Sequence, residues 1–194
     1  MNQLPPRPDF EKIEAAAPAS ADQRTAVLAL IGNIVFSWSN NESLLIYVMM
    51  LLLDSDEISA AIVFSTLNTT RARLDLIDRL ARVNVTDRAV AKELRRLMER
   101  FNACTRARNE LNHCMYTLDD RGVITHTKSL RLETSRGRLR WGTERPVDDK
   151  RLDELKTMLR EMRDLNRELW GFLPRLQAGV RHIQKTNVST TQSK

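Results

Sequence analysis

The chain has 194 residues, of which 42% are hydrophobic, and a formal net charge of +6. This length suits one domain with a sizeable core better than two small ones. The positive charge favours contact with something acidic, such as a nucleic acid, although an ordinary basic surface would give the same composition.

Residues 1–20 contain four prolines and few hydrophobic residues, and they lack the basic-then-apolar layout of a signal peptide. We therefore expect a disordered arm here. A single helical domain should follow over residues 21–180, and a disordered tail over residues 181–194.

The first long helix is predicted from Asp22 to Leu53, with apolar runs at residues 26–36 and 44–53. Polar residues interrupt these runs, and neither is long enough to span a bilayer, so we expect no membrane partner. The second run is apolar on most sides, which predicts either a central helix or a dimer seam. Glu42 lies in this helix four residues after Trp38. It is either a solvent-facing side chain or the partner of a buried cation.

A second helical region is predicted from about Ile58 to Val83. Residues 54–57 indicate its start, with Glu57 placed three residues after Asp54 as in a capping box. Residues 67–70 are either a break in this region or a polar turn of one helix. Thr86 is the predicted N-cap of the next helix.

Two stripes run along the third long helix. Apolar residues recur at three- and four-residue steps at Leu94, Leu97, Phe101, Cys104, Leu111 and Met115. Arg108 falls inside this stripe, and its charge needs a partner. Glu42 is the candidate, so the pattern predicts one buried pair. A polar stripe lies beside the apolar one and consists of Asn102, Arg106, Asn109 and His113.

The two cysteines, Cys104 and Cys114, are ten residues apart on this predicted helix. Ten helical residues span about 15 Å, which is too far for a disulfide. We expect reduced thiols in a cytoplasmic protein. The histidines show no ligand spacing with these cysteines, so we predict neither a metal nor another cofactor.

A small basic β-hairpin is predicted at about residues 121–145. Residues 123–132 are rich in β-branched side chains, a turn follows at residues 135–137, and residues 138–141 alternate polar with apolar. Its candidate RNA-binding residues are Lys128, Arg131, Arg136, Arg138 and Arg140, with Trp141 available for stacking. The alternative is a solvated edge hairpin whose tryptophan packs on the bundle.

The last helix is predicted to begin after Pro146, with Asp148 as its cap and with Pro174 and Gly179 bending or ending it. Its apolar stripe consists of Leu152, Leu155, Leu159, Met162, Leu165, Leu169 and Phe172. The expected fold is all-α: an up-and-down bundle of four to five helices with the hairpin inserted before the last long helix.

The segment Arg108-Asn109-Glu110-Leu111-Asn112-His113 resembles the Arg-x4-6-His motif of HEPN domains, in which a polar residue, often Asn, directly follows the arginine. The order of the predicted helices over residues 24–178 also resembles that family, although the hairpin after the motif departs from its simplest form. The resemblance implies a metal-independent endoribonuclease that works as a dimer, in a setting such as a toxin–antitoxin pair or defence.

In that reading His113 is the general acid or base, Arg108 holds the scissile phosphate, and Asn109 orients His113 or contacts the phosphate. Glu42, Asn112 and Arg106 are supporting residues. The implied partners are a second copy of the chain, RNA, and an antitoxin or other protein. Two alternatives stay open: a non-catalytic HEPN module that binds RNA, a nucleotide or a protein, and a structural helical dimer.

Overall fold

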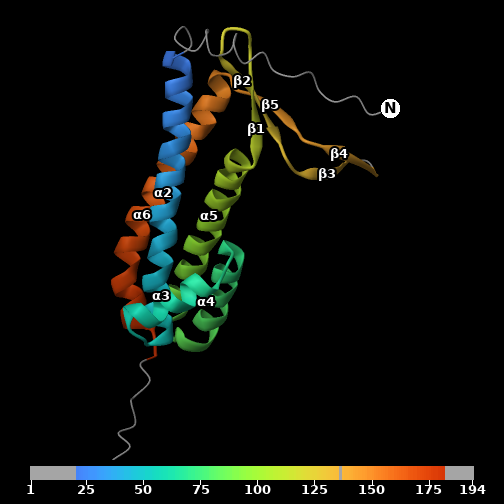
Figure 1. Cartoon of the computed structure of the whole chain (residues 1–194). Coiled ribbons are helices and arrows are strands. Elements are labelled where there is room, and N and C mark those ends of the chain that lie inside the picture. Colours follow the sequence, from blue (N-terminus) through green and yellow to red (C-terminus); the bar gives the residue numbers. More distant parts are fainter. Residues whose placement is uncertain (1–20, 136, 182–194) are drawn as a thin grey trace, which may run out of the picture. The chain divides into compact units, whose positions relative to one another are not determined.

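The structure is a computed structural model that describes residues 21–135 and 137–181 (Figure 1). Its helices within these ranges are α2 (Ala21–Leu53), α3 (Glu57–Thr66), α4 (Thr70–Asn84), α5 (Arg88–Asn112) and α6 (Asp149–Gly179). Its strands are β1 (Cys114–Leu118), β2 (Ile124–Ser129), β3 (Leu132–Ser135), β4 (Arg138–Trp141) and β5 (Glu144–Pro146). The predicted all-α bundle with a small β insertion before the last long helix is confirmed.

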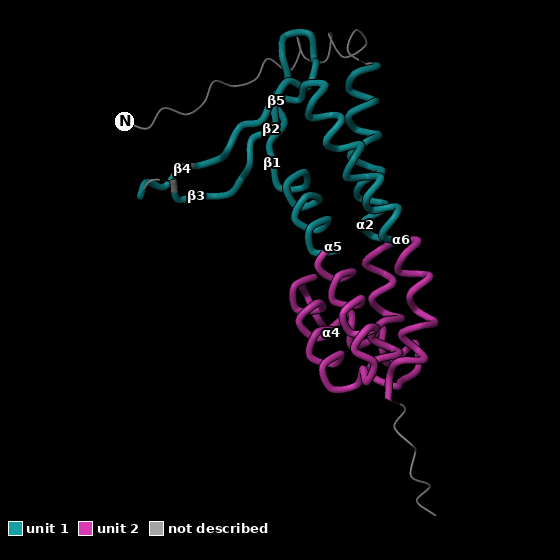
Figure 2. The backbone as a smooth tube through the Cα atoms, turned by 180° about the vertical axis from the view of Figure 1, so that it is seen from behind, with its two compact units in different colours: residues 1–40, 101–166 teal, residues 41–100, 167–194 magenta. Residues whose placement is uncertain are grey.

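The chain forms two compact units, which Figure 2 distinguishes by colour. Within the described ranges, unit 1 contains residues 21–40 and 101–166, and unit 2 contains residues 41–100 and 167–181. Three long helices, α2, α5 and α6, contribute residues to both units. The prediction that residues 21–180 form a single domain stays a prediction.

The core of unit 1 is built around Trp38 of α2. Its ring stacks on Phe101 of α5 with a centroid separation of 6.1 Å, and its Nε1–H donates to Thr105 Oγ1 at 2.9 Å. A hydrogen-bonded indole can be buried without leaving its N–H unsatisfied. The α6 residues of the predicted stripe that belong to this core are Leu155, Leu159, Met162 and Leu165.

The core of unit 2 contains the apolar run at residues 44–53, whose buried members are Leu44, Leu45, Val48, Met49 and Leu52. These side chains are at most 2% exposed, so the run is a central helix of this unit. The sequence left open whether residues 44–53 form a central helix or a dimer seam, and their packing within this unit is that of a central helix. Ile77 of α4 and Phe172 of α6 are also fully buried in this unit.

The predicted helix boundaries are close, but two predicted caps are wrong. The N-cap of α3 is Asp56, whose carboxylate accepts from Ser59 N–H, and not Asp54. Asp54 instead ends α2 with a left-handed φ of 48°. The N-cap of α5 is Asp87, which accepts from Ala89 N–H, whereas the Thr86 hydroxyl donates to the carbonyl of Gly179.

At two other boundaries the structure agrees with the sequence analysis: it settles the break near residues 67–70, which was left open, and it confirms the predicted cap at Asp148. Residues 67–69 form a real break between α3 and α4, and Thr69 caps α4 by accepting from Ala72 N–H. Asp148 caps α6 as predicted, by accepting from Arg151 N–H. Pro174 lies inside α6, which continues to Gly179.

The β region is larger than the single predicted hairpin. β1, β2 and β5 form an antiparallel sheet in the order β1-β2-β5, and β3 and β4 form a separate two-stranded hairpin. α5 ends at Asn112, and both Cys114 and Met115 lie in β1, so the prediction that these two residues belong to the third helix is wrong. The predicted strand at residues 123–132 breaks after Ser129, where β3 leaves the sheet.

The predicted N-terminal arm lies outside the described residues, as does the C-terminal tail beyond residue 181. No helix in the described part of the chain combines the length and the apolar content needed to cross a membrane.

A basic pocket at the end of helix α5

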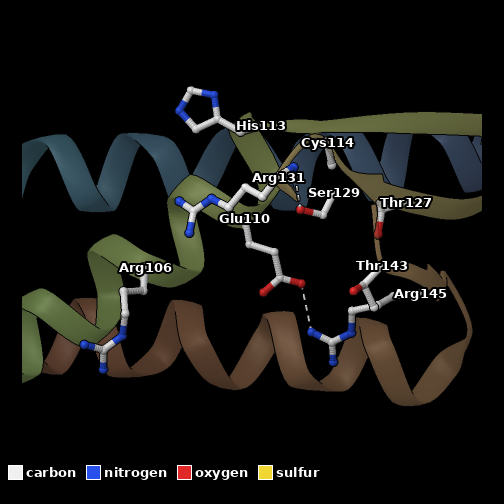
Figure 3. A pocket seen from close by; sticks show the side chains of 9 residues that line it. All are labelled: Arg106, Glu110, His113, Cys114, Thr127, Ser129, Arg131, Thr143 and Arg145. Carbon is white, nitrogen blue, oxygen red and sulfur yellow. Dashed lines mark hydrogen bonds and ion pairs between the residues drawn. The ribbon is translucent and has the colours of Figure 1, made fainter. Parts of the chain in front are cut away.

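A pocket with a volume of about 470 Å³ lies within unit 1, where α5 meets the sheet (Figure 3). It is lined by Arg106, Glu110, His113, Cys114, Thr127, Ser129, Arg131, Thr143 and Arg145. Three of these residues, Arg106, His113 and Arg131, were candidate site residues on sequence grounds. The pocket therefore joins part of the predicted motif to the base of the predicted hairpin.

Helix α5 supplies Arg106, Glu110 and His113, which are spaced by four and three residues. This spacing places all three on one helical face, as the polar stripe predicted for Arg106 and His113. Both of these end members are exposed. The stripe stops at His113 because α5 ends at Asn112 and the chain turns into β1.

The sheet supplies the opposite wall. Cys114 of β1 pairs with Ser129 of β2, and Thr127 of β2 pairs with Arg145 of β5. Residues directly opposite each other, or two apart on one strand, share a face of a sheet. Cys114, Ser129, Thr127 and Arg145 therefore share one face, and all four line the pocket.

The same sheet face is attached to the last turn of α5. The Tyr116 hydroxyl donates to the carbonyl of Leu111 at 2.9 Å, and the Cys114 thiol donates to the same oxygen at 3.2 Å. Burial raises the pKa of both groups above their ordinary values. Cys114 is consequently a thiol and not a nucleophilic thiolate at neutral pH.

An ion network lies at one side of the pocket. Glu110 Oε1 accepts from Arg145 at 2.8 Å and from Arg151 at 2.7 Å. Glu154 Oε2 accepts from the same two arginines, at 2.9 and 3.0 Å. Two carboxylates thus neutralise two guanidinium groups and tie α5 to β5 and α6. Arg151 itself is only 6% exposed.

Three other groups of the pocket have no such neutralisation. Within the described residues, neither the Arg106 nor the Arg131 guanidinium forms an ion pair, and the His113 ring forms no hydrogen bond. Guanidinium groups bind phosphate with two parallel N–H donors. The pocket can therefore hold a phosphate group next to an imidazole.

Arg108, the first residue of the predicted motif, does not line this pocket. Its guanidinium lies over the Trp38 ring, 3.5 Å from the centroid. Arg108 and His113 are five residues apart, which places them on different faces of α5. Asn109, which is half-buried, and Asn112, which is exposed, also lie outside the lining of the pocket.

Glu42, the predicted partner of Arg108, belongs to unit 2, where its carboxylate has a cation of its own. Its Oε1 accepts from Arg73 at 2.8 Å and from the Thr70 hydroxyl at 2.7 Å. The Glu42 side chain is only 14% exposed, so its interpretation as a solvent-facing residue is wrong. Arg73 was overlooked because it lies on the polar-looking helix α4.

The candidate RNA-binding residues are divided by the sheet. Lys128 alternates with Thr127 and Ser129, so it lies on the face opposite the pocket. There it pairs with Glu144 at 3.2 Å and lies 5.1 Å from the Trp141 ring centroid. Arg138 is exposed on β4. Arg136 and the side chain of Arg140 lie outside the described residues.

Six residues of the pocket were not candidates on sequence grounds: Glu110, Cys114, Thr127, Ser129, Thr143 and Arg145. Glu110 had a detectable signal, because it lies four residues after Arg106 and three before His113 on the polar side of the helix. The sheet residues had none, because their convergence depends on a β1–β2 pairing that was not predicted.

Comparisons of this chain with protein-family models, with curated proteins and with solved structures found no match. By its fold and its pocket, the chain is a helical bundle with an inserted sheet and a basic pocket that contains a histidine. Within the described part of the chain, no group of three or more His, Cys, Asp or Glu side chains could hold a metal ion.

Proposed function

We propose that this chain is a metal-independent endoribonuclease of the HEPN type that acts on RNA phosphodiesters at the basic pocket. The observation that carries the proposal is the exposed His113 in a pocket with Arg106 and Arg131, two guanidinium groups without acidic partners among the described residues. A phosphodiester supplies the negative charge that these two groups lack.

In this chemistry the 2′-hydroxyl of RNA attacks the neighbouring phosphorus. The O2′–P bond forms and the P–O5′ bond breaks, which leaves a 2′,3′-cyclic phosphate and a 5′-hydroxyl. His113 transfers a proton at one of these two oxygens, since imidazole exchanges protons near neutral pH. Arg106 and Arg131 stabilise the additional negative charge of the transition state.

A non-catalytic RNA-binding module is the second candidate, and the position of Arg108 favours it. The guanidinium of Arg108 lies on Trp38, outside the lining of the pocket, although the HEPN resemblance gives this residue the phosphate-holding role. A two-fold homodimer, with one such pocket in each subunit, remains part of the endoribonuclease proposal.

The test incubates the purified full chain with mixed-sequence RNA in EDTA. We expect cleavage of RNA but not of DNA, with 2′,3′-cyclic or 3′-phosphate ends, because the attacking group is the 2′-hydroxyl. His113→Ala should lower the rate by about 10²- to 10⁴-fold. His126→Ala is the matched control, since His126 is also exposed but alternates with Thr127 and so faces away from the pocket.

Equal and negligible cleavage by the wild type and His113→Ala would reject the endoribonuclease. Retained RNA binding in that case would establish the non-catalytic module. A rate that falls equally in His113→Ala and His126→Ala would show that the pocket is not the site of cleavage.

A further inference from the structure

Glu110 is the one carboxylate among the nine described residues that line the pocket. A carboxylate in a pocket that binds phosphate works against binding, because it repels the ligand. Glu110 must therefore have either a chemical role or a structural role, and the ion network is the candidate structural role. The surroundings of its two carboxylate oxygens distinguish these two roles.

The two carboxylate oxygens of Glu110 have different surroundings. Oε1 accepts from Arg145 and Arg151, which fix the position of the carboxylate. Oε2 has no hydrogen bond within the described residues, and the side chain is 37% exposed. The ion network thus holds one oxygen and leaves the other available to accept a proton from a ligand.

Glu110 also stands in a defined relation to His113. The two residues are three positions apart on α5, a spacing that brings side chains to one helical face with Cβ atoms about 5–6 Å apart. Figure 3 shows the His113 ring on one side of the Arg131 guanidinium and the Glu110 carboxylate on the other. All three side chains line the same pocket, so a phosphate held there by Arg131 has both a carboxylate and an imidazole in its surroundings.

We propose that Glu110 is the general base and His113 the general acid of a cleavage site contained in one chain. This inference rests on the proposed endoribonuclease function and assigns the role of each residue. Glu110 Oε2 takes the proton of the 2′-hydroxyl as the O2′–P bond forms. The His113 imidazolium gives its proton to the 5′-oxygen as the P–O5′ bond breaks. Exchange with water then restores both groups.

Charged and titratable groups from several elements lie around Glu110. Arg106 precedes it on α5, Cys114 lies on β1, Arg131 follows β2, Arg145 lies on β5 and Arg151 lies on α6. Four of these groups are guanidinium cations. Arg106 and Arg131, which have no acidic partner among the described residues, stabilise the transition state, in which the phosphate gains charge.

The ion network supplies a matched control for this role. Glu154 accepts from the same two arginines as Glu110 but does not line the pocket. Glu110→Gln and Glu154→Gln therefore each remove one charge from the same network, and only the first removes the base. A structural role predicts similar losses from both variants, whereas the catalytic role predicts a loss from Glu110→Gln alone.

The first experiment measures single-turnover cleavage of RNA in EDTA together with RNA affinity and thermal unfolding. We expect Glu110→Gln to cleave about 10²- to 10⁴-fold more slowly than wild type. Its affinity should be equal or higher, because a repelling charge is gone. Glu154→Gln should cleave within a few-fold of wild type. Equal rates for the two variants would overturn the proposal.

Glu110→Asp covers the case in which Glu110→Gln does not fold. Aspartate keeps the charge that the arginines need but withdraws the carboxylate by one methylene from the 2′-hydroxyl. We expect a folded protein whose rate falls at least tenfold, since proton transfer depends on reach. A folded Glu110→Asp with the wild-type rate would overturn the assignment of the base.

The second experiment mixes Glu110→Gln chains with His113→Ala chains after joint refolding. A site contained in one chain predicts no recovery, because every site then lacks one of the two groups. A site shared between subunits predicts recovery, because half of the shared sites in a mixed dimer keep both groups. Recovered activity would overturn the one-chain site. Absence of cleavage by the wild type itself would instead reject the endoribonuclease proposal.

Discussion

Among the described residues, helix α5 borders one hollow in unit 1 and another in unit 2, and the larger of this pair is the weaker candidate for a site. The hollow in unit 2 has a volume of about 640 Å³ and is lined by residues of α5 alone: Ala89, Lys92, Glu93, Arg95, Arg96 and Glu99. The pocket in unit 1 has a volume of about 470 Å³ and is lined by residues from α5, the sheet strands and the segments that join them.

Both hollows contain cations without an acidic partner among the described residues. In unit 2, Arg96 pairs with Glu168 and Glu93 pairs with Arg175, whereas Lys92 and Arg95 form no ion pair. In unit 1, Arg106 and Arg131 have no acidic partner among the described residues. The convergence of several elements around its cations, and not volume, therefore distinguishes the pocket in unit 1 as the candidate ligand site.

The largest effect should come from truncating Trp38 in the core of unit 1, and it should fall on the free energy of unfolding. Trp38 is 7% exposed and bonded to Thr105, so Trp38→Ala should lower the free energy of unfolding by about 3–5 kcal/mol. Trp170→Ala is the control in unit 2, where the ring is 53% exposed. Urea unfolding of both variants checks this, and equal losses would contradict the assigned core.

An intermediate effect should come from removing the cations themselves. The double variant Arg106→Ala, Arg131→Ala should weaken RNA binding by about 10- to 100-fold and reduce the salt slope for single-stranded RNA by about 1.4. Lys92→Ala, Arg95→Ala removes the same charge from the other hollow and should change affinity little. Binding titrations between low and physiological salt test this, and similar losses in both doubles would indicate binding by net charge alone.

The smallest effect should come from Cys114, although it lines the pocket. Burial raises the pKa of this thiol, so it stays protonated at neutral pH and cannot act as the nucleophile. Cys114→Ser should therefore leave the cleavage rate within about threefold. Alkylation of Cys114 by iodoacetamide should be slow at neutral pH and accelerate as the pH rises. A large loss of activity in Cys114→Ser would assign this residue a catalytic role.

The sequence predicted the helices well because their apolar stripes and polar interruptions are local patterns. Leu155, Met162 and Leu169 are all buried as the period of α6 required. The sheet was harder, because β1 follows the helix without a break in hydrophobicity. Met115 continued the apolar spacing of α5, yet it lies in β1 and is 48% exposed.

Two residues of the pocket were candidates on sequence grounds for the same reason. Arg106 and His113 belong to one helical face, which sequence spacing fixes, and both line the pocket. The predicted pair of Arg108 and Glu42 depended on contacts across the fold, which spacing does not determine. Glu42 pairs with Arg73 of α4, and Arg108 lies over Trp38.

Unit 1 is built from two separate segments of the chain, and this has a consequence for synthesis on the ribosome. Contacts that complete unit 1 join residues far apart in sequence, such as Gln23 with Ile124 across 101 positions. The ion network beside the pocket further requires Arg151 and Glu154 of the last helix. A nascent chain therefore carries His113 before it carries a finished pocket, and translation must pass Glu154 before the ion network can form.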